Sequence, residues 1–316
     1  MSRAPRRSLR RRPDGPVEAL ATPNPPRSLA GRPSLGPRRV GRGAAVSFAR
    51  LRGPVILGVL NVTPDSFSDG GRFLDVDSAV AQAQRMADDG ADWIDVGGES
   101  TRPGAEPIPE AEELRRVLPV VERIARLRPV SIDTTKAAVA ARALDAGAAI
   151  VNDVSGATAD PRMLEVVAGR RAAIILMHRK GTPKTMERLA RYRDVVGEVK
   201  RFLQRRIAAA LDAGVAPQAI AVDPGIGFAK NLEHNLQLLA RIGEIAALGV
   251  PVVVGVSRKR FLGRLLGQPP DQRLEGTIAA SLLAVAGGAR IVRVHDVAAV
   301  ARALRVARAI WGAARP

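Results

Sequence analysis

PVSIDTTKAAVAARALDAGAAIVND, residues 129–153, is one complete repeat of the pattern that decides the fold. Two apolar runs, at 129–132 and 148–151, have the length and the β-branched or aliphatic composition of buried strands. The residues between them favour a helix, and Gly147 lies just before the second run, where a helix commonly ends in a left-handed residue. The stretch therefore predicts a strand, a helix and a second strand.

The same alternation continues from residue 54 to about residue 310. Six more strand-like runs occur, at 55–60, 92–96, 172–176, 219–222, 251–256 and 290–292. All of the runs are apolar on both faces, which is typical of parallel strands, and the segments between them repeat apolar residues at spacings of three and four. Eight such units predict an α/β protein with a closed (β/α)₈ TIM barrel, and an open doubly wound sheet stays as the alternative.

The first part of the chain has a different composition. Residues 1–45 are rich in arginine and proline and show no apolar period, so we expect a disordered extension, followed by one catalytic barrel domain at 46–316. Residues 1–52 hold thirteen arginines against Asp14 and Glu18, so most of the net charge of +18 comes from this segment. We interpret it as a solvated tail. Weak nucleic-acid binding, an acidic partner and a targeting role stay open for the tail alone.

Composition also excludes several kinds of site. The chain has no cysteine, which excludes disulfides, thiolate zinc sites and cysteine nucleophiles. No run of eighteen apolar residues occurs, and no apolar segment follows the basic N-terminus, so neither a membrane span nor a secretory signal is predicted. We expect a soluble cytoplasmic protein with no membrane partner.

Polar side chains follow every one of the eight strand-like runs. In a TIM barrel the active site is built at the carboxyl ends of the strands, so these side chains should meet at one mouth. They include Asn61, Thr101, Arg102, Asp133, Asn152, Met177 with His178, Asp223, Ser257 with Lys259, and Arg293 with His295.

Two kinds of chemistry are present among these residues. Arginine, lysine and histidine suit a phosphate-bearing ligand, because guanidinium groups match pairs of phosphate oxygens. Asp133, Asn152 and Asp223 suit a planar heterocycle that presents N–H and amino donors. A ligand with a flat, amidine-like edge at one end and phosphates at the other would satisfy both sets.

Single residues in this set also have ordinary structural explanations. Asp133 could cap a helix that begins near Thr135, Asn152 could close a turn, and Asp223 could be a turn aspartate before Pro-Gly. We interpret His178 as a rim residue that hydrogen-bonds the backbone. Polar groups at all eight strand ends nevertheless favour one shared site. The sequence lacks the spacing of a nucleophile elbow, a helical zinc pair or a P-loop.

Nine motifs then occur in unbroken order between residue 53 and about residue 310. They are GVLNVTPDSFSDGG, DVGGESTRPGA, SIDTTK, NDVSG, LMHRKGTPKTM, DPGIGFAK, GVSRKRFLG, EGTIAASLLAV and RVHDV. Together they resemble the successive motifs of the dihydropteroate synthase family of pterin-binding enzymes. The resemblance implies condensation of 6-hydroxymethyl-7,8-dihydropterin pyrophosphate with 4-aminobenzoate in folate biosynthesis. It also implies Mg²⁺, a homodimer and a slot that binds sulfonamide drugs.

The resemblance assigns a role to each matching residue. The pterin would contact Asp133, Asn152, Met177, Asp223, Lys259 and Arg293. The pyrophosphate would contact Asn61, Thr101, Arg102, Arg293 and His295, and Asn61 would also bind the metal. The 4-aminobenzoate slot would be formed by Phe67, Thr101, Arg102, Pro103, Gly227, Phe228, Ser257 and Lys259. The residues expected to carry catalysis are Asn61, Asp133, Lys259, Arg293 and His295.

One long polar loop follows the first strand, and its length favours a functional role. We expect residues 64–73 to form a lid in which Phe67 excludes water. Two further hypotheses remain within the same barrel family. A pterin-dependent methyltransferase would share the pterin-binding residues but would not need pyrophosphate ligands, and an inactive paralogue would share the whole site.

Overall fold

The computed structural model describes residues 46–63 and 72–313, with side chains described from residue 76 in the second range. Eight parallel strands form one sheet in the order β6-β5-β4-β3-β2-β1-β8-β7. They are β1 (Val55–Asn61), β2 (Trp93–Gly97), β3 (Val130–Asp133), β4 (Ile150–Asp153), β5 (Ala173–Met177), β6 (Ile220–Asp223), β7 (Val253–Gly255) and β8 (Ile291–Val294).

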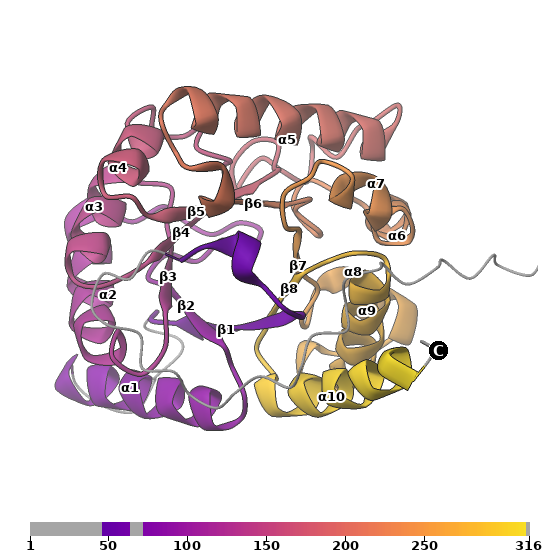
Figure 1. The fold of residues 1–316 in the computed structure, drawn as a ribbon, viewed down its shortest axis with the longest axis horizontal. Coiled ribbons are helices and arrows are strands. Elements are labelled where there is room, and N and C mark those ends of the chain that lie inside the picture. Colours follow the sequence, from indigo (N-terminus) through magenta and orange to yellow (C-terminus); the bar gives the residue numbers. More distant parts are fainter. Residues whose placement is uncertain (1–45, 64–71, 314–316) are drawn as a thin grey trace, which may run out of the picture.

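Helices surround this sheet as an outer ring (Figure 1). They are α1 (Arg72–Asp88), α2 (Glu110–Ile124), α3 (Ala137–Asp145), α4 (Met163–Gly169), α5 (Val195–Asp212), α6 (Leu232–Ala240), α7 (Ile242–Ala246), α8 (Arg260–Leu266), α9 (Leu274–Ala286) and α10 (Val297–Ala313). Short 3₁₀ turns are η1 (Phe48–Arg50), η3 (Pro217–Ala219) and η4 (Pro270–Gln272).

The sheet closes on itself as a barrel. β1 pairs with both β2 and β8, and the remaining junction, between β6 and β7, is made by an isolated bridge from Val222 to Val252. This arrangement confirms the predicted (β/α)₈ barrel and excludes the open sheet. The predicted basic extension, residues 1–45, lies outside the described residues.

The helices cover the barrel with the faces that their periodicity predicts. On α1, Ala79 and Ala83 are fully buried, and on α2, Val117, Val121 and Ile124 are fully buried. Gly147 adopts φ +115°, the positive value expected for the residue that ends a helix before a strand. No helix in the described part of the chain is long and apolar enough to cross a bilayer.

Seven of the eight strands extend beyond the predicted apolar runs at their carboxyl ends, and β7 ends one residue short of its run. β3, β4 and β6 each end on an aspartate that continues the ladder, because the neighbouring strand still offers backbone partners there. Asp133 lies opposite Gly97 on one side and Asn152 on the other, and Met177 lies opposite Asp223. The register therefore places the predicted polar groups side by side at one end of the barrel.

Candidate active site

A half-buried guanidinium joins three strands at this end of the barrel. Nε of Arg293, on β8, lies 2.6 Å from Oδ2 of Asp95 on β2, and its Nη2 lies 2.7 Å from Oδ2 of Asp133 on β3. Asn152 on β4 donates to the same oxygen of Asp95 over 3.1 Å. Three predicted site residues are thus linked to one another through Asp95.

Sequence reasoning missed Asp95, which is completely buried. It lies inside the second strand-like run, in DWIDV, where a charged residue is expensive unless it is paired. A charged residue within an apolar strand-like run is therefore the signal by which the sequence could have identified Asp95.

The charges of this network influence one another. Burial raises the pKa of Asp133, and the positive charge of Arg293 opposes that rise. Burial alone would lower the pKa of Arg293, but the carboxylates of Asp95 and Asp133 raise it above its ordinary value. The guanidinium is therefore a permanent cation, and two of its nitrogens are already engaged by carboxylates.

Asp223 and Lys259 form a second pair of opposite charges at the mouth. Asp223 is only 6 % exposed, and burial raises its pKa while Lys259 opposes the rise. Burial lowers the pKa of Lys259 to about 8, with Asp223 acting in the opposite direction. Asp223 also accepts the backbone N–H of Gly225 over 2.7 Å, so the turn-aspartate interpretation is confirmed.

The loop after β6 packs against Lys259. The lysine donates to the carbonyl of Ile226 and lies 4.7 Å from the centre of the Phe228 ring. Gly227 has φ +83°, and a Cβ added there would approach Cδ of Lys259 to 3.0 Å. Gly227, Phe228 and Lys259, all predicted for the 4-aminobenzoate slot, are therefore in one place.

Ser257 and His295 lie together on the β7 and β8 side. The Ser257 hydroxyl accepts the backbone N–H of His295 over 3.2 Å and lies 3.0 Å from its Nδ1. Burial, with the nearby charges of Arg293 and Arg258, lowers the pKa of His295 to about 4. The imidazole is consequently neutral at pH 7 and provides hydrogen bonds rather than charge.

The remaining described site residues lie at the rim. Asn61 ends β1, and a Cβ added to Gly97 would lie 3.9 Å from its Oδ1 and 3.6 Å from Cβ of Asp133. Thr101 is half-buried in the loop between β2 and α2, and Thr101 and Asp133 line the same small cavity. In that loop Arg102 and Pro103 are exposed. Met177 is buried at the end of β5.

Phe67 and most of the predicted lid, residues 64–71, lie outside the described residues. The hypothesis of a mobile lid therefore stays a prediction.

One structural interpretation made from the sequence is wrong, and one is extended. Asp133 does not cap α3: that helix begins at Ala137, whose N–H donates to Oδ2 of Asp160 over 3.0 Å. His178 does hydrogen-bond backbone at the strand end, since its N–H donates to the carbonyl of Asp223 over 3.0 Å, and its ring nitrogen Nδ1 also lies 3.0 Å from Nζ of Lys230. Burial lowers the pKa of His178 to about 2, so its neutral ring can accept a hydrogen bond from this lysine.

Comparison with known proteins agrees with this geometry. Residues 57–295 match the family model described as pterin binding enzyme. The dihydropteroate synthase of Synechocystis sp. is 50 % identical over 259 residues, covering 81 % of this chain and 90 % of that protein.

Solved structures give the same result. The Xanthomonas albilineans dihydropteroate synthase with 4-aminobenzoic acid superposes with a TM-score of 0.78 at 48 % identity, covering 83 % of this chain and 94 % of that one. The Yersinia pestis dihydropteroate synthase in a sulfonamide drug complex also gives a TM-score of 0.78, at 43 % identity over 86 % of this chain and 98 % of that one. The chain therefore belongs to the dihydropteroate synthase family of pterin-binding enzymes.

Proposed function

We propose that this chain condenses 6-hydroxymethyl-7,8-dihydropterin pyrophosphate with 4-aminobenzoate, giving 7,8-dihydropteroate and pyrophosphate in folate biosynthesis. One observation carries the proposal: Arg293 is held between Asp95 and Asp133 at a mouth that also contains Asp223 and Lys259. Such a mouth offers acidic acceptors and fixed cations within one buried site. The relatives of this chain that bear the same activity in their names support the assignment.

The pterin would lie on the buried, acidic side of the mouth. A carboxylate accepts two parallel N–H bonds from a 2-amino-pyrimidinone edge, and Asp223 is the buried carboxylate best suited to this, with Asn152 and Asp133 beside it. Lys259 would donate to the pterin carbonyl, and Met177 and Arg293 would contact the ring. Burial of these groups excludes water, which strengthens each of these hydrogen bonds.

The pyrophosphate would lie toward the rim, against Asn61, Thr101, Arg102 and His295. Arg102 supplies charge there, whereas neutral His295 supplies a hydrogen bond that Ser257 orients. Nε and Nη2 of Arg293 already bond Asp95 and Asp133. The remaining nitrogen, Nη1, would donate to the pyrophosphate.

The donor set also fits Mg²⁺. The described residues contain no group of three or more histidine or acidic side chains placed to hold a metal ion. Mg²⁺ commonly takes only one or two protein oxygens and completes its shell with substrate phosphates and water, and the amide oxygen of Asn61 beside Asp133 suits that mode. Bound there, Mg²⁺ would neutralise charge on the departing pyrophosphate.

The reaction would proceed as a dissociative substitution. The bond from the pterin methylene carbon to the pyrophosphate oxygen breaks with its electron pair leaving on oxygen, and the amine nitrogen of 4-aminobenzoate then bonds to that carbon and loses a proton to water. The anionic forms of Asp133 and Asp223 would stabilise the cationic pterin, while Arg102 and Arg293 would stabilise the leaving group. An arylamine is already unprotonated at neutral pH, so positioning replaces a strong general base.

The 4-aminobenzoate slot would be formed by the loop after β6, the loop after β2 and the end of β7. Gly227, Phe228, Ser257 and Lys259 supply one wall, and Thr101, Arg102 and Pro103 supply the other. Sulfonamides, which occupy the Yersinia pestis relative, would compete for this slot. Phe67 would complete it.

We also propose a homodimer and a cytoplasmic location. Three large apolar side chains on neighbouring helices are exposed, Leu283 on α9 and Val306 and Ile310 on α10. α9 and α10 lie side by side on the outside of the barrel, so these residues offer a face for a second copy (Figure 1). The absence of cysteine agrees with a reducing compartment.

Pyrophosphate release by the purified protein, measured with and without 4-aminobenzoate, tests the function. We expect release that depends on 4-aminobenzoate and falls by about 100-fold or more in Asp223→Asn, because the amide replaces a charged acceptor. Asp271→Asn, an exposed aspartate on η4, is the matched control and should leave the rate unchanged.

Two other outcomes would contradict the proposal. Release without any need for 4-aminobenzoate, or none in the presence of both substrates and Mg²⁺, would indicate an inactive paralogue or another activity. Methyl transfer from a methylated pterin to a corrinoid would instead establish the methyltransferase.

A further inference from the structure

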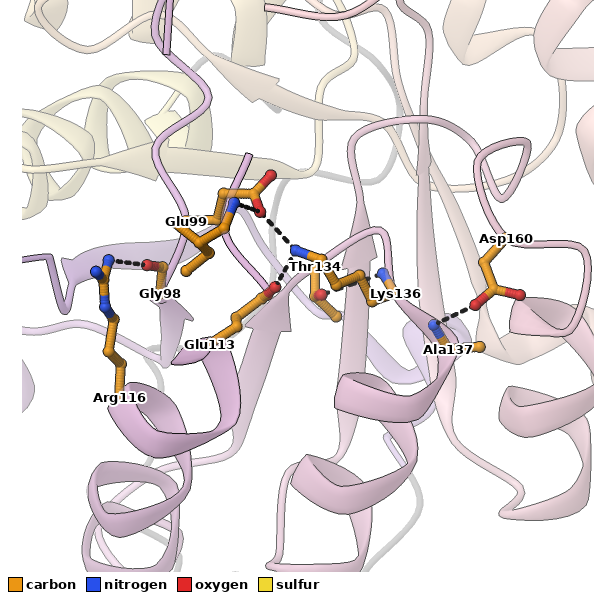
Figure 2. Close-up of polar contacts among 9 residues, drawn as sticks. Gly98, Glu99, Glu113, Arg116, Thr134, Lys136, Ala137 and Asp160 are labelled. Atoms are coloured by element: carbon orange, nitrogen blue, oxygen red, sulfur yellow. Dashed lines mark hydrogen bonds and ion pairs between the residues drawn. The ribbon is translucent and has the colours of Figure 1, made fainter. Parts of the chain in front are cut away.

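An ion cluster beside the mouth joins three elements of the barrel, and its members Glu99 and Glu113 line the small cavity that Thr101 and Asp133 also line. Nζ of Lys136, just before α3, donates to Oε2 of Glu99 over 2.5 Å and to Oε2 of Glu113 over 2.6 Å (Figure 2). Glu99 follows β2, and Glu113 lies in the first turn of α2. The side chain of Glu113 is 1 % exposed, and those of Glu99 and Lys136 are 21 % and 25 % exposed.

The carboxylate of Glu99 also closes the loop between β2 and α2. Oε2 of Glu99 accepts the backbone N–H of Ile108 over 3.1 Å. This hydrogen bond links the start of the loop, at Glu99, to its end, near Ile108. The carbonyl of Gly98 accepts Nη1 of Arg116 from α2 over 2.9 Å, which fixes the chain immediately before it (Figure 2). The base of the loop is therefore clasped to α2 and to the residue that precedes α3.

Beyond this clasp the loop is exposed. Arg102, Pro103 and Gly104 are exposed, and the N–H of Gly104 donates to the carbonyl of Pro183 over 3.0 Å. An exposed pair between Glu106 and Lys184 adds little to its position, because surface ion pairs are weak. Apart from the bond between Gly104 and Pro183, the contacts described here that tie this loop to the barrel lie at its base.

The cluster needs a cation at residue 136. Burial works to lower the pKa of Lys136, but its bonds to Glu113 and Glu99 raise it above the ordinary value, so the lysine stays charged. Without that charge Glu113 would be a buried carboxylate with no cation, and Glu99 would be repelled by it. The backbone at this point is itself fixed, since Thr134 Oγ1 accepts the N–H of Lys136 over 3.2 Å.

We propose that Lys136 is a positioning residue: by clasping Glu99 and Glu113 it holds the β2–α2 loop so that Thr101 and Arg102 meet 4-aminobenzoate and the pyrophosphate. The inference rests on the proposed function. In this proposal Lys136 makes no contact with substrate. Among the described residues no side-chain hydrogen bond or ion pair joins the cluster to Asp133, Asn152 or Asp223, although the charge of Glu113 acts on Asp133.

The main test compares Lys136→Met with Lys136→Arg in steady-state assays with both substrates. We expect Lys136→Met to lower kcat/KM for 4-aminobenzoate by roughly 10- to 100-fold, since a displacement of about 1 Å at a substrate-positioning group can cost that much. Binding of 6-hydroxymethylpterin, which lacks the diphosphate, should change by less than about twofold because it does not use the loop. Lys136→Arg, which keeps a cation able to bond both glutamates, should recover most of the activity.

A second variant separates positioning from stability. Lys136→Met combined with Glu113→Leu removes the uncompensated buried charge, so its unfolding midpoint should return toward that of the parent protein, while Glu99 remains unclasped and kcat/KM remains low. Lys184→Met is the matched control, because it breaks an exposed ion pair on the same loop. We expect that control to stay within about twofold of the parent.

Three results would overturn the proposal. They are a kcat/KM for 4-aminobenzoate in Lys136→Met within twofold of the parent, a parallel loss of 6-hydroxymethylpterin binding, or full recovery of kcat/KM in the double variant. Amide hydrogen exchange of residues 99–109 gives a readout that does not need turnover, and Lys136→Met should speed exchange there. If the parent protein fails to release pyrophosphate, the proposed function fails, and the exchange experiment still decides whether Lys136 fixes the loop.

Discussion

Nη2 of Arg293 lies 2.7 Å from Oδ2 of Asp133, although 160 positions separate the two residues along the chain. The contact crosses the barrel mouth from β8 to β3, and Asp95 from β2 completes it through Nε of the same guanidinium. A single arginine thus compensates two buried carboxylates at the centre of the site. This ion network therefore contributes both to the stability of the fold and to the geometry of the candidate site.

The first prediction concerns the stability of this network. Arg293→Met leaves Asp95 and Asp133 as buried carboxylates without a cation, so we expect the free energy of unfolding to fall by about 3–5 kcal/mol. Urea denaturation measures the change, and Arg302→Met on the exposed face of α10 is the matched control. In an Asp95→Asn background the same substitution should cost less, and equal costs in the two backgrounds would show that the pair does not interact.

The second prediction concerns the pH dependence of activity. The pKa of Lys259 is lowered to about 8, so this lysine carries its charge below that pH and loses it above. We expect kcat/KM to fall as pH rises through about 8. Lys259→Arg keeps a charge that does not titrate in this range, and it should therefore lack the alkaline limb. Persistence of the limb in that variant would assign it to another group.

The third prediction concerns the pH dependence of stability. Burial lowers the pKa of His295 from 6.5 to about 4 in the folded state, so the unfolded state binds more protons between these values. This contribution to stability is complete above pH 6.5 and is lost as the pH falls toward 4. Replacement of His295 by Gln should flatten the decline of the urea midpoint over that window. An unchanged slope would mean that the imidazole titrates normally in the folded protein.

The fourth prediction uses two glycines with the same backbone conformation. Gly227 and Gly249 have φ +83° and +82°, but a Cβ on Gly227 would meet Lys259, whereas a Cβ on Gly249 would meet nothing within 4 Å. Alanine at either position should cost about 1–2 kcal/mol of unfolding free energy. Only Gly227→Ala should also raise KM for 4-aminobenzoate, because it displaces Lys259. Equal kinetics for the two variants would place the slot elsewhere.

The fifth prediction concerns association. Ile310→Glu on α10 introduces a charge into the exposed apolar face, where Ile310 is 64 % exposed, and it should convert a dimer into a monomer in analytical ultracentrifugation. Leu211→Glu on α5 makes the same change on a different side of the barrel and should leave the dimer intact. Dissociation by both variants, or by neither, would contradict an interface on α9 and α10.

The sequence alone predicts the barrel because the apolar patterns that define its strands and helices repeat over a few neighbouring residues. Strand and helix patterns need only neighbouring residues, and the rule that parallel strands end at one mouth then brings Asp133, Asn152 and Asp223 together. The ends of β3, β4 and β6 were predicted one or two residues short, since an aspartate after an apolar run resembles a turn and its pairing becomes visible only with the adjacent strand.

Pairings across the barrel could not be obtained in the same way. The partners of Asp95 and Lys136 come from other strands and helices, at separations of 198 residues for Asp95 to Arg293 and 37 for Lys136 to Glu99. The ring of His178 likewise has its partner 52 residues away. Each of these contacts depends on how strands and helices pack, which no local period records.

The junction of β6 and β7 has a mechanical consequence. Adjacent strands elsewhere share regular ladders, but here a single bridge joins Val222 to Val252, with Asp223 one residue beyond it on β6 and Lys259 just past the end of β7. A ligand held by both side chains, as proposed above, would link β6 and β7 where the two strands share the fewest backbone hydrogen bonds. Substrate binding would then stiffen the barrel at this junction.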